Sequence, residues 1–193
     1  MPRRAMYQPV SAIILFIIIL ASFAYSQPEP PGAASPAPAG DLKVWVLNGL
    51  ERVLRDDPAG SRTSIALYVA RNEWESCQIA LRSSKFVRIN DLTPEFFTHP
   101  SGAFLTVDNF RIYREHQLHL EHASRRNDDF RAGWYPDPLI PFYHPLSFLR
   151  LTEGRFSAVP FNLPPDETHA FWIDFYIPED TMPGRYKGAF NVL

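Results

Sequence analysis

Residues 170–177 read AFWIDFYI, and this stretch decides the fold class. The odd-numbered positions 171–177 are all apolar, whereas Trp172, Asp174 and Tyr176 alternate with them. Successive side chains of a β-strand point to opposite faces, so the odd-numbered residues share one apolar face. The pattern predicts a half-buried strand that turns this face toward the core and Trp172 away from it.

The same alternation recurs along the chain between short runs rich in Gly, Pro and Asp. Strands are predicted at residues 42–47, 63–70, 75–82, 86–92, 108–119, 155–162, 170–177 and 185–193. Short turns between many strands favour antiparallel pairing over a parallel α/β sheet. The sequence therefore predicts an all-β fold, an antiparallel two-sheet β-sandwich of immunoglobulin-like or jelly-roll-like type.

Two kinds of segment interrupt this pattern. Residues 50–55 and 94–97 allow a short turn of helix each, and residues 122–149 are expected to form a long irregular loop. Long loops commonly carry function or pack as a compact flap over the domain. The outer-face rings of the strands are expected to be covered by this loop or to form an interface.

Length and charge exclude two classes of protein. The chain has 193 residues and a formal net charge of −2. A complete (β/α)₈ barrel needs about 250 residues, so none fits here. Nucleic-acid-binding domains usually carry a basic patch, and the balanced charge argues against a nucleic-acid partner.

The N-terminus is typical of an exported protein. Arg3 and Arg4 precede an apolar run at residues 10–25, and Ala24 and Ser26 are small residues that suit cleavage before Gln27. We predict a signal peptide at residues 1–26, a Pro/Ala-rich linker at 27–41 and a β-sandwich domain at 42–193. The expected location is secreted or periplasmic, without a stable membrane span after cleavage. An uncleaved anchor is the alternative, although the apolar run is short for a membrane span.

The side chains that could take part in catalysis or metal binding form no specific motif. Cys77 is the only cysteine, and its alternation with Ile79 predicts a buried apolar role. His116, His119 and His122 lie three apart, a spacing that points strand residues to opposite faces, so no metal site is expected. The adjacent acidic pairs suit turns as well as catalysis. We assign no catalytic residue, no metal ligand and no cofactor.

Four phrases in the sequence resemble one known family. They are ARNEWESCQI at residues 70–79, YREH at 113–116, GWYPDPLIP at 133–141, and FWIDFYIPEDTMPGRYKGAFNV at 171–192. In this order they look like the N-terminal β-sandwich domain of glycoside hydrolase family 123-like proteins. The resemblance covers about residues 42–193.

The resemblance implies a non-catalytic domain. In that family the sandwich precedes a TIM barrel, which carries an adjacent Asp-Glu pair for hydrolysis of N-acetylgalactosaminides. No acidic residue of this chain matches that pair, so none is assigned its role. The expected function is that of an accessory domain of a secreted carbohydrate-active protein, with a TIM-barrel catalytic domain as partner if the chain is a fragment. The alternatives are the front part of such a glycosidase and a stand-alone module that binds carbohydrate or a cell surface.

One segment suggests a ligand surface. In residues 133–141, Gly133 permits a tight turn and the prolines stiffen the backbone, which would fix Trp134 and Tyr135 for sugar stacking or domain docking. The expected ligand-binding residues are Trp134, Tyr135, Asp137 and Trp172, and the possible ligand is a glycan. The alternative is that this segment packs over the edge of the sandwich through its apolar residues.

Overall fold

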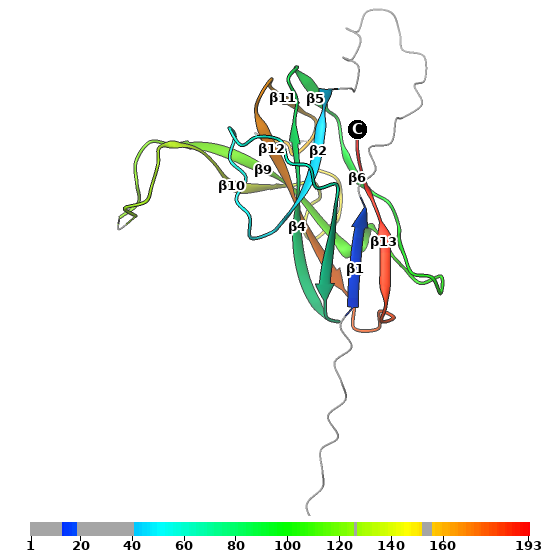
Figure 1. The fold of residues 1–193 in the computed structure, drawn as a ribbon. Coiled ribbons are helices and arrows are strands. Elements are labelled where there is room, and N and C mark those ends of the chain that lie inside the picture. Colours follow the sequence, from blue (N-terminus) through cyan, green and yellow to red (C-terminus); the bar gives the residue numbers. More distant parts are fainter. Residues whose placement is uncertain (1–12, 19–40, 126, 152–155) are drawn as a thin grey trace, which may run out of the picture.

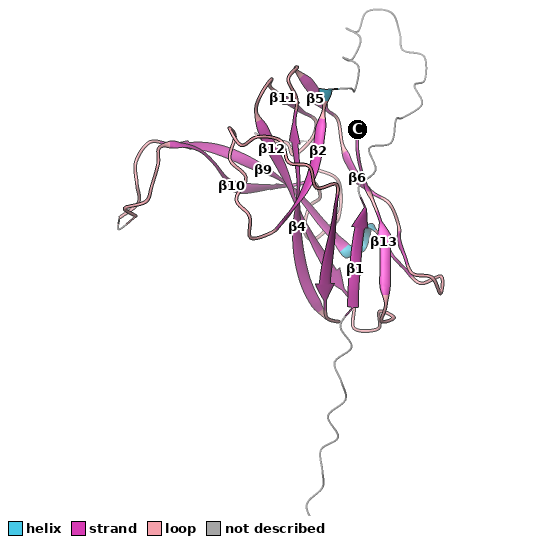
Figure 2. Cartoon of the chain, in the orientation of Figure 1, coloured by secondary structure: helices cyan, strands magenta, loops and turns pink. Residues whose placement is uncertain are grey.

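The computed structural model describes residues 13–18, 41–125, 127–151 and 156–193. Within these ranges the chain is built from strands and loops, and its helical residues are 3₁₀ turns such as η2 (Val107–Asn109) (Figure 2). The predicted signal peptide and linker lie outside the described residues, apart from residues 13–18 and 41. No helix in the described part is long and apolar enough to cross a membrane.

The fold has two main sheets of five strands each, called A and B. Sheet B has the longer strands, and all its neighbouring strands are antiparallel. Its central strand is the one that contains residues 170–177, paired on both sides (Figure 1). In spatial order the strands are β10 (Gly133–Pro141), β9 (Phe110–Leu120), β12 (Thr168–Ile177), β4 (Glu73–Arg82) and β2 (Lys43–Asn48).

Sheet A faces sheet B and has shorter strands. Its pairs are antiparallel except for β1 and β13, which run parallel. In spatial order they are β3 (Ser64–Val69), β1 (Ile13–Ile18), β13 (Arg185–Gly188), β7 (Phe97–Thr98) and β8 (Phe104–Leu105). Two small sheets pair β11 (Phe161–Leu163) with β5 (Val87–Ile89) and β14 (Phe190–Val192) with β6 (Leu92–Pro94). The all-β, antiparallel two-sheet prediction is confirmed.

The core lies between the sheets and is rich in aromatic rings. Phe175 contacts Phe110 edge to face with ring centroids 5.1 Å apart, and Phe97 meets Phe175 in the same way at 5.6 Å. Edge-to-face contacts of this kind stabilise a core beyond the area they bury. Cys77 is also fully buried there, as predicted. The odd-numbered residues of 171–177 are all fully buried, which confirms the predicted face: Phe171, Ile173, Phe175 and Ile177.

The expectation of an irregular loop at residues 122–149 is wrong for its central part. Residues 133–141 form β10, which pairs with β9 and is an edge strand of sheet B. Proline cannot donate a backbone hydrogen bond, but an edge strand pairs on one side only and so tolerates it. The register shifts between Pro136 and Leu139, so the ladder is irregular at the prolines themselves.

The two segments expected to allow a helical turn are not helical. Residues 94–97 span the end of β6 and the start of β7. Residues 50–55 belong to a loop that folds over Trp45, whose side chain is only 4% exposed. Gln78 holds this loop by donating from Nε2 to the carbonyl oxygens of Asn48 and Glu51. An outer-face ring is therefore covered by the chain, but by the loop after β2 and not by residues 122–149.

Candidate functional site

The outward side of sheet B gathers large side chains that the core does not use. Cross-strand register places Trp172 beside Gln78 and Tyr113, and Asp174 beside Ser76 and Arg111. Residues directly opposite each other on antiparallel strands lie on the same face. We call this set the outer face, and it comprises Trp74, Arg111, Tyr113, Trp172, Asp174 and Tyr176.

Asp174 organises the middle of the outer face. Its Oδ1 accepts a hydrogen bond from Trp172 Nε1 at 2.5 Å and another from Ser76 Oγ at 2.6 Å. This hydrogen bond to a carboxylate fixes the indole ring in one orientation. The Trp172 side chain is partly exposed. Burial raises the pKa of Tyr113, and the nearby Asp174 carboxylate adds to the effect. The phenol therefore stays a neutral donor at physiological pH.

Trp74 provides the most exposed ring of the outer face. Its side chain is 46% exposed, and its ring packs against Tyr176 with centroids 5.0 Å apart. Arg111 lies beside it, with Cζ 5.6 Å from the Trp74 ring centroid and 4.7 Å from that of Phe148. A guanidinium at this range is attracted to the ring faces. Arg111 thus links the outer face to the segment after β10.

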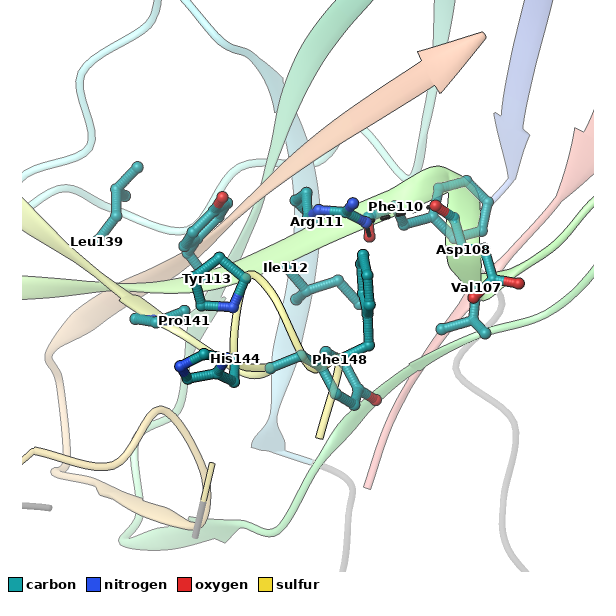
Figure 3. A pocket seen from close by; sticks show the side chains of 12 residues that line it. Val107, Asp108, Phe110, Arg111, Ile112, Tyr113, Leu139, Pro141, His144 and Phe148 are labelled. Carbon is teal, nitrogen blue, oxygen red and sulfur yellow. Dashed lines mark hydrogen bonds between the residues drawn. The ribbon is translucent and has the colours of Figure 1, made fainter. Parts of the chain in front are cut away.

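A cavity of about 450 Å³ opens beside Arg111 (Figure 3). Phe148 forms part of its wall with a backbone φ of 55°, a left-handed conformation that costs a bulky residue roughly 1–2 kcal/mol. Leu146 and Leu149 beside it are 85% and 70% exposed. The cavity is lined by Val107, Asp108, Phe110, Arg111, Ile112, Tyr113, Leu139, Pro141, Tyr143, His144, Pro145 and Phe148.

A polar cluster anchors the other end of the β9–β10 hairpin. Arg55 donates from Nε to Gln117 Oε1 at 2.7 Å and lies 3.5 Å from Glu167 Oε2. Its guanidinium carbon sits 3.4 Å from the centroid of the Trp134 ring. Glu167 also contacts His169 Nε2 at 3.1 Å. These contacts tie the hairpin, which projects from the body in Figure 1, to the loop after β2.

The structure places the predicted ligand residues as follows. Trp134 is 38% exposed, with Arg55 against one side and His119 in ring contact at 5.2 Å. Tyr135 stacks on Phe130 at 5.9 Å and donates its hydroxyl to a backbone carbonyl. Asp137 is exposed at the register shift of β10.

Trp134 and Trp172 share one side of sheet B but are not neighbours. Trp172 lies opposite Tyr113 of β9, whereas Trp134 lies opposite His119. Six residues of strand separate these positions, or about 20 Å at 3.3 Å per residue. The four predicted residues therefore do not converge on a single small ligand, although an extended chain could span them.

Glu115 is a residue that the sequence reasoning missed. It is 5% exposed, its Oε1 has no hydrogen-bond partner, and burial raises its pKa to about 7. It lies opposite Leu139 and two residues from Tyr113 on the same side of β9. The sequence signal that could have pointed to Glu115 is a charged residue in the middle of the predicted strand at 108–119.

His116 and Glu73 have structural contacts. His116 packs against Phe156, and burial with the nearby Arg114 and Arg55 lowers its pKa. Glu73 accepts a hydrogen bond from the Ala70 backbone and so holds the turn between β3 and β4. No group of three His, Cys, Asp or Glu side chains suited to a metal ion occurs in the ranges that the structure covers.

Comparisons with known proteins give a likeness of fold. No protein-family model matches the sequence, and no curated protein matches it either. The structure is similar to that of a family 123 glycoside hydrolase from Clostridium perfringens, an enzyme of glycolipid glycan hydrolysis, with a TM-score of 0.57 and 15% sequence identity. The match covers 79% of this chain and 24% of that chain. The chain thus resembles, in fold, a quarter of a larger glycoside hydrolase.

Proposed function

We propose that the chain is a non-catalytic accessory β-sandwich domain of a secreted or periplasmic carbohydrate-active protein. The observation that carries the proposal is the fold likeness to 24% of a family 123 glycoside hydrolase, over 79% of this chain. The remaining three quarters of that enzyme leave ample room for a catalytic domain of barrel size. The sequence phrases noted above, from 70–79 to 171–192, support the same relationship.

The outer face and the adjoining cavity are the proposed contact surface for the rest of such a protein. Leu146, Phe148 and Leu149 expose large apolar side chains next to the cavity, at 85%, 51% and 70%. Exposed apolar residues that cluster, rather than scatter, are typical of interfaces. Arg111 and Trp74 extend this surface with groups that are common at binding hot spots.

An activity assay on the purified chain tests the non-catalytic role. A chromogenic N-acetylgalactosaminide is incubated with the chain, and release of the chromophore is compared with buffer alone. The expected result is no release above buffer, because the proposed catalytic groups belong to another domain. Hydrolysis that scales with chain concentration would overturn the proposal.

The gene and the exported protein provide a positive test. We expect the reading frame beyond the Leu193 codon to encode a barrel of about 250 residues with an adjacent Asp-Glu pair. N-terminal sequencing of the exported protein should begin at Gln27 if the signal peptide is removed. A protein recovered with Met1 intact in the membrane fraction would favour the anchor instead.

Binding of a glycan is the second candidate, and the rings on sheet B favour it. Trp74 and Trp172 are held in fixed orientations by Tyr176 and Asp174, which lowers the entropic cost of stacking on a sugar. Titration with N-acetylgalactosamine-containing oligosaccharides should change Trp fluorescence, and Trp172→Ala should weaken binding. Tyr68→Ala serves as the control, since its ring is 66% exposed on β3 of the other sheet. Trp134→Ala tests whether binding extends to that predicted residue, about 20 Å away along β9. No response from the unmodified chain, or equal affinity in all variants, would remove this candidate.

A further inference from the structure

Among the strands that the structure describes, β3 pairs with one neighbour. Within the ranges that the structure covers, β3 pairs only with β1, and β1 pairs on its other side with β13. The pairing with β3 is antiparallel over six residues, from Ile13 opposite Val69 to Ile18 opposite Ser64. The pairing with β13 is parallel over four residues. Figure 1 shows β1 in blue beside β13 in red. One strand thus joins two parts of sheet A that do not pair with each other.

The two flanking strands have the alternation that a strand in this space requires. On β3, Leu67 and Val69 are 3% and 1% exposed, whereas Tyr68 between them is 66% exposed. On β13, Tyr186 is buried and donates its hydroxyl to the backbone of Met182. A strand added in register therefore continues a sheet with one face on the core. Without it, two rows of backbone N–H and C=O groups lose their partners.

The strand that fills this space lies in the segment expected to be removed on export. Residues 13–18 read IILFII and fall inside the predicted signal peptide, residues 1–26. Cleavage before Gln27 would take β1 away and leave β3 and β13 separated by the width of one strand.

We propose that the space between β3 and β13 is a strand-acceptor site, which in the processed chain binds an extended apolar segment of another polypeptide. The segment at residues 13–18 defines the chemistry of the occupant: six residues without charge or proline, antiparallel to β3. Binding of this kind is β-strand addition, in which main-chain hydrogen bonds supply affinity and alternate side chains supply specificity. The inference rests on the proposed export and signal-peptide cleavage, and not on any role in carbohydrate binding.

Amide hydrogen exchange on the full chain tests the site, with residues 1–26 retained by expression without export. Leu15 lies opposite both Leu67 and Tyr186, so Leu15→Pro removes a backbone donor at the centre of β1. Exchange of the β3 amides should become at least about tenfold faster, because their opening no longer requires breaking of a ladder. Amides of β4 and β12 should not change, and Val10→Pro, three positions before Ile13 in the sequence, is the matched control.

The emptied site is then offered a strand in trans. The probe is IILFII flanked by two lysines at each end for solubility, added to the Leu15→Pro chain. It should restore slow exchange in β3, whereas the same peptide with proline at its third apolar position should not. Unchanged β3 exchange on the Leu15→Pro substitution, or failure of the probe to slow it, would overturn the proposal.

A cross-link checks the register without relying on the proline variant. Ile14 lies opposite Tyr68, and partners in an antiparallel pair are close enough for a disulfide. The Ile14→Cys/Tyr68→Cys chain should form a disulfide within one molecule, whereas Ile14→Cys/Ser64→Cys should not. Equal cross-linking in the two chains, or none in either, contradicts the site. A cross-link that joins two molecules would make a second copy the occupant and would overturn the assignment to a foreign strand.

Discussion

Burial changes the acidity of Glu115. The carboxyl of this β9 residue is only 5% exposed with one oxygen unpartnered, and loss of solvation raises its pKa from 4.5 to about 7. Burial disfavours the charged carboxylate, so the protonated carboxyl group is the more stable form in such surroundings. The folded chain therefore binds this proton more tightly than the unfolded chain does.

Stability should consequently depend on pH through Glu115. Because the folded-state pKa is the higher one, the free energy of unfolding falls as the pH rises from 4.5 to about 7, by roughly 3 kcal/mol at 1.36 kcal/mol per unit. Glu115→Gln should remove this loss and leave the variant more stable than the native chain at pH 8. Urea unfolding of both chains at pH 4.5 and pH 8 measures the change in the free energy of unfolding.

Glu179→Gln is the control for this prediction, since Glu179 is exposed. Its substitution should leave the pH dependence of the native chain intact. If Glu115→Gln shows the same fall in stability between pH 4.5 and pH 8 as the native chain, Glu115 is not the titrating group.

The loop after β2 packs closely against the sheet. A Cβ added at Gly60 would lie 2.5 Å from a ring carbon of Trp45, and that ring is 4% exposed. The ring is enclosed by the loop and the sheet, so it has little freedom to move aside. The absence of a side chain at Gly60 is what lets the loop cover Trp45.

Gly60→Ala should therefore lower the free energy of unfolding by about 1–3 kcal/mol through overpacking. It should also shift Trp fluorescence to longer wavelength, because the loop is pushed away from Trp45. Gly133→Ala is the matched control, since a Cβ there meets nothing within 4 Å. Equal stability of the two variants would show that the loop adapts without cost.

The strands of sheet B differ in how many hydrogen-bonded neighbours and buried contacts hold them in place across the molecule. β12 is paired along both edges and its core-facing side chains are fully buried. β10 is an edge strand interrupted by a register shift, and its hairpin with β9 projects from the sandwich in Figure 1. Local opening follows the number of buried contacts and shared hydrogen bonds.

Hydrogen exchange should accordingly be slowest in β12 and β4 and fastest in β10. The opposite edge strand, β2, should be intermediate, because it is covered by the loop over Trp45. Mass spectrometry of proteolytic fragments after timed exchange measures this order. Protection of β10 equal to that of β12 would show that the Arg55 cluster locks the hairpin as firmly as the core.

Alternation of apolar and polar residues in 170–177 and similar runs was enough to predict the fold class, because such alternation is typical of half-buried strands. It also predicted which side of β4 and β12 faces the core, as Cys77 and the odd-numbered residues of 171–177 show.

The pairing of residues 133–141 as β10 could not be predicted from the sequence and is known from the fold. Their prolines weaken the local strand signal, and the pairing depends on β9 lying alongside. The tertiary structure also decided that Trp134 and Trp172 share a side yet lie about 20 Å apart, and that Glu115 is buried. Such distances and burials arise from strand register and cross-chain packing, which join residues far apart in the sequence and leave no local pattern.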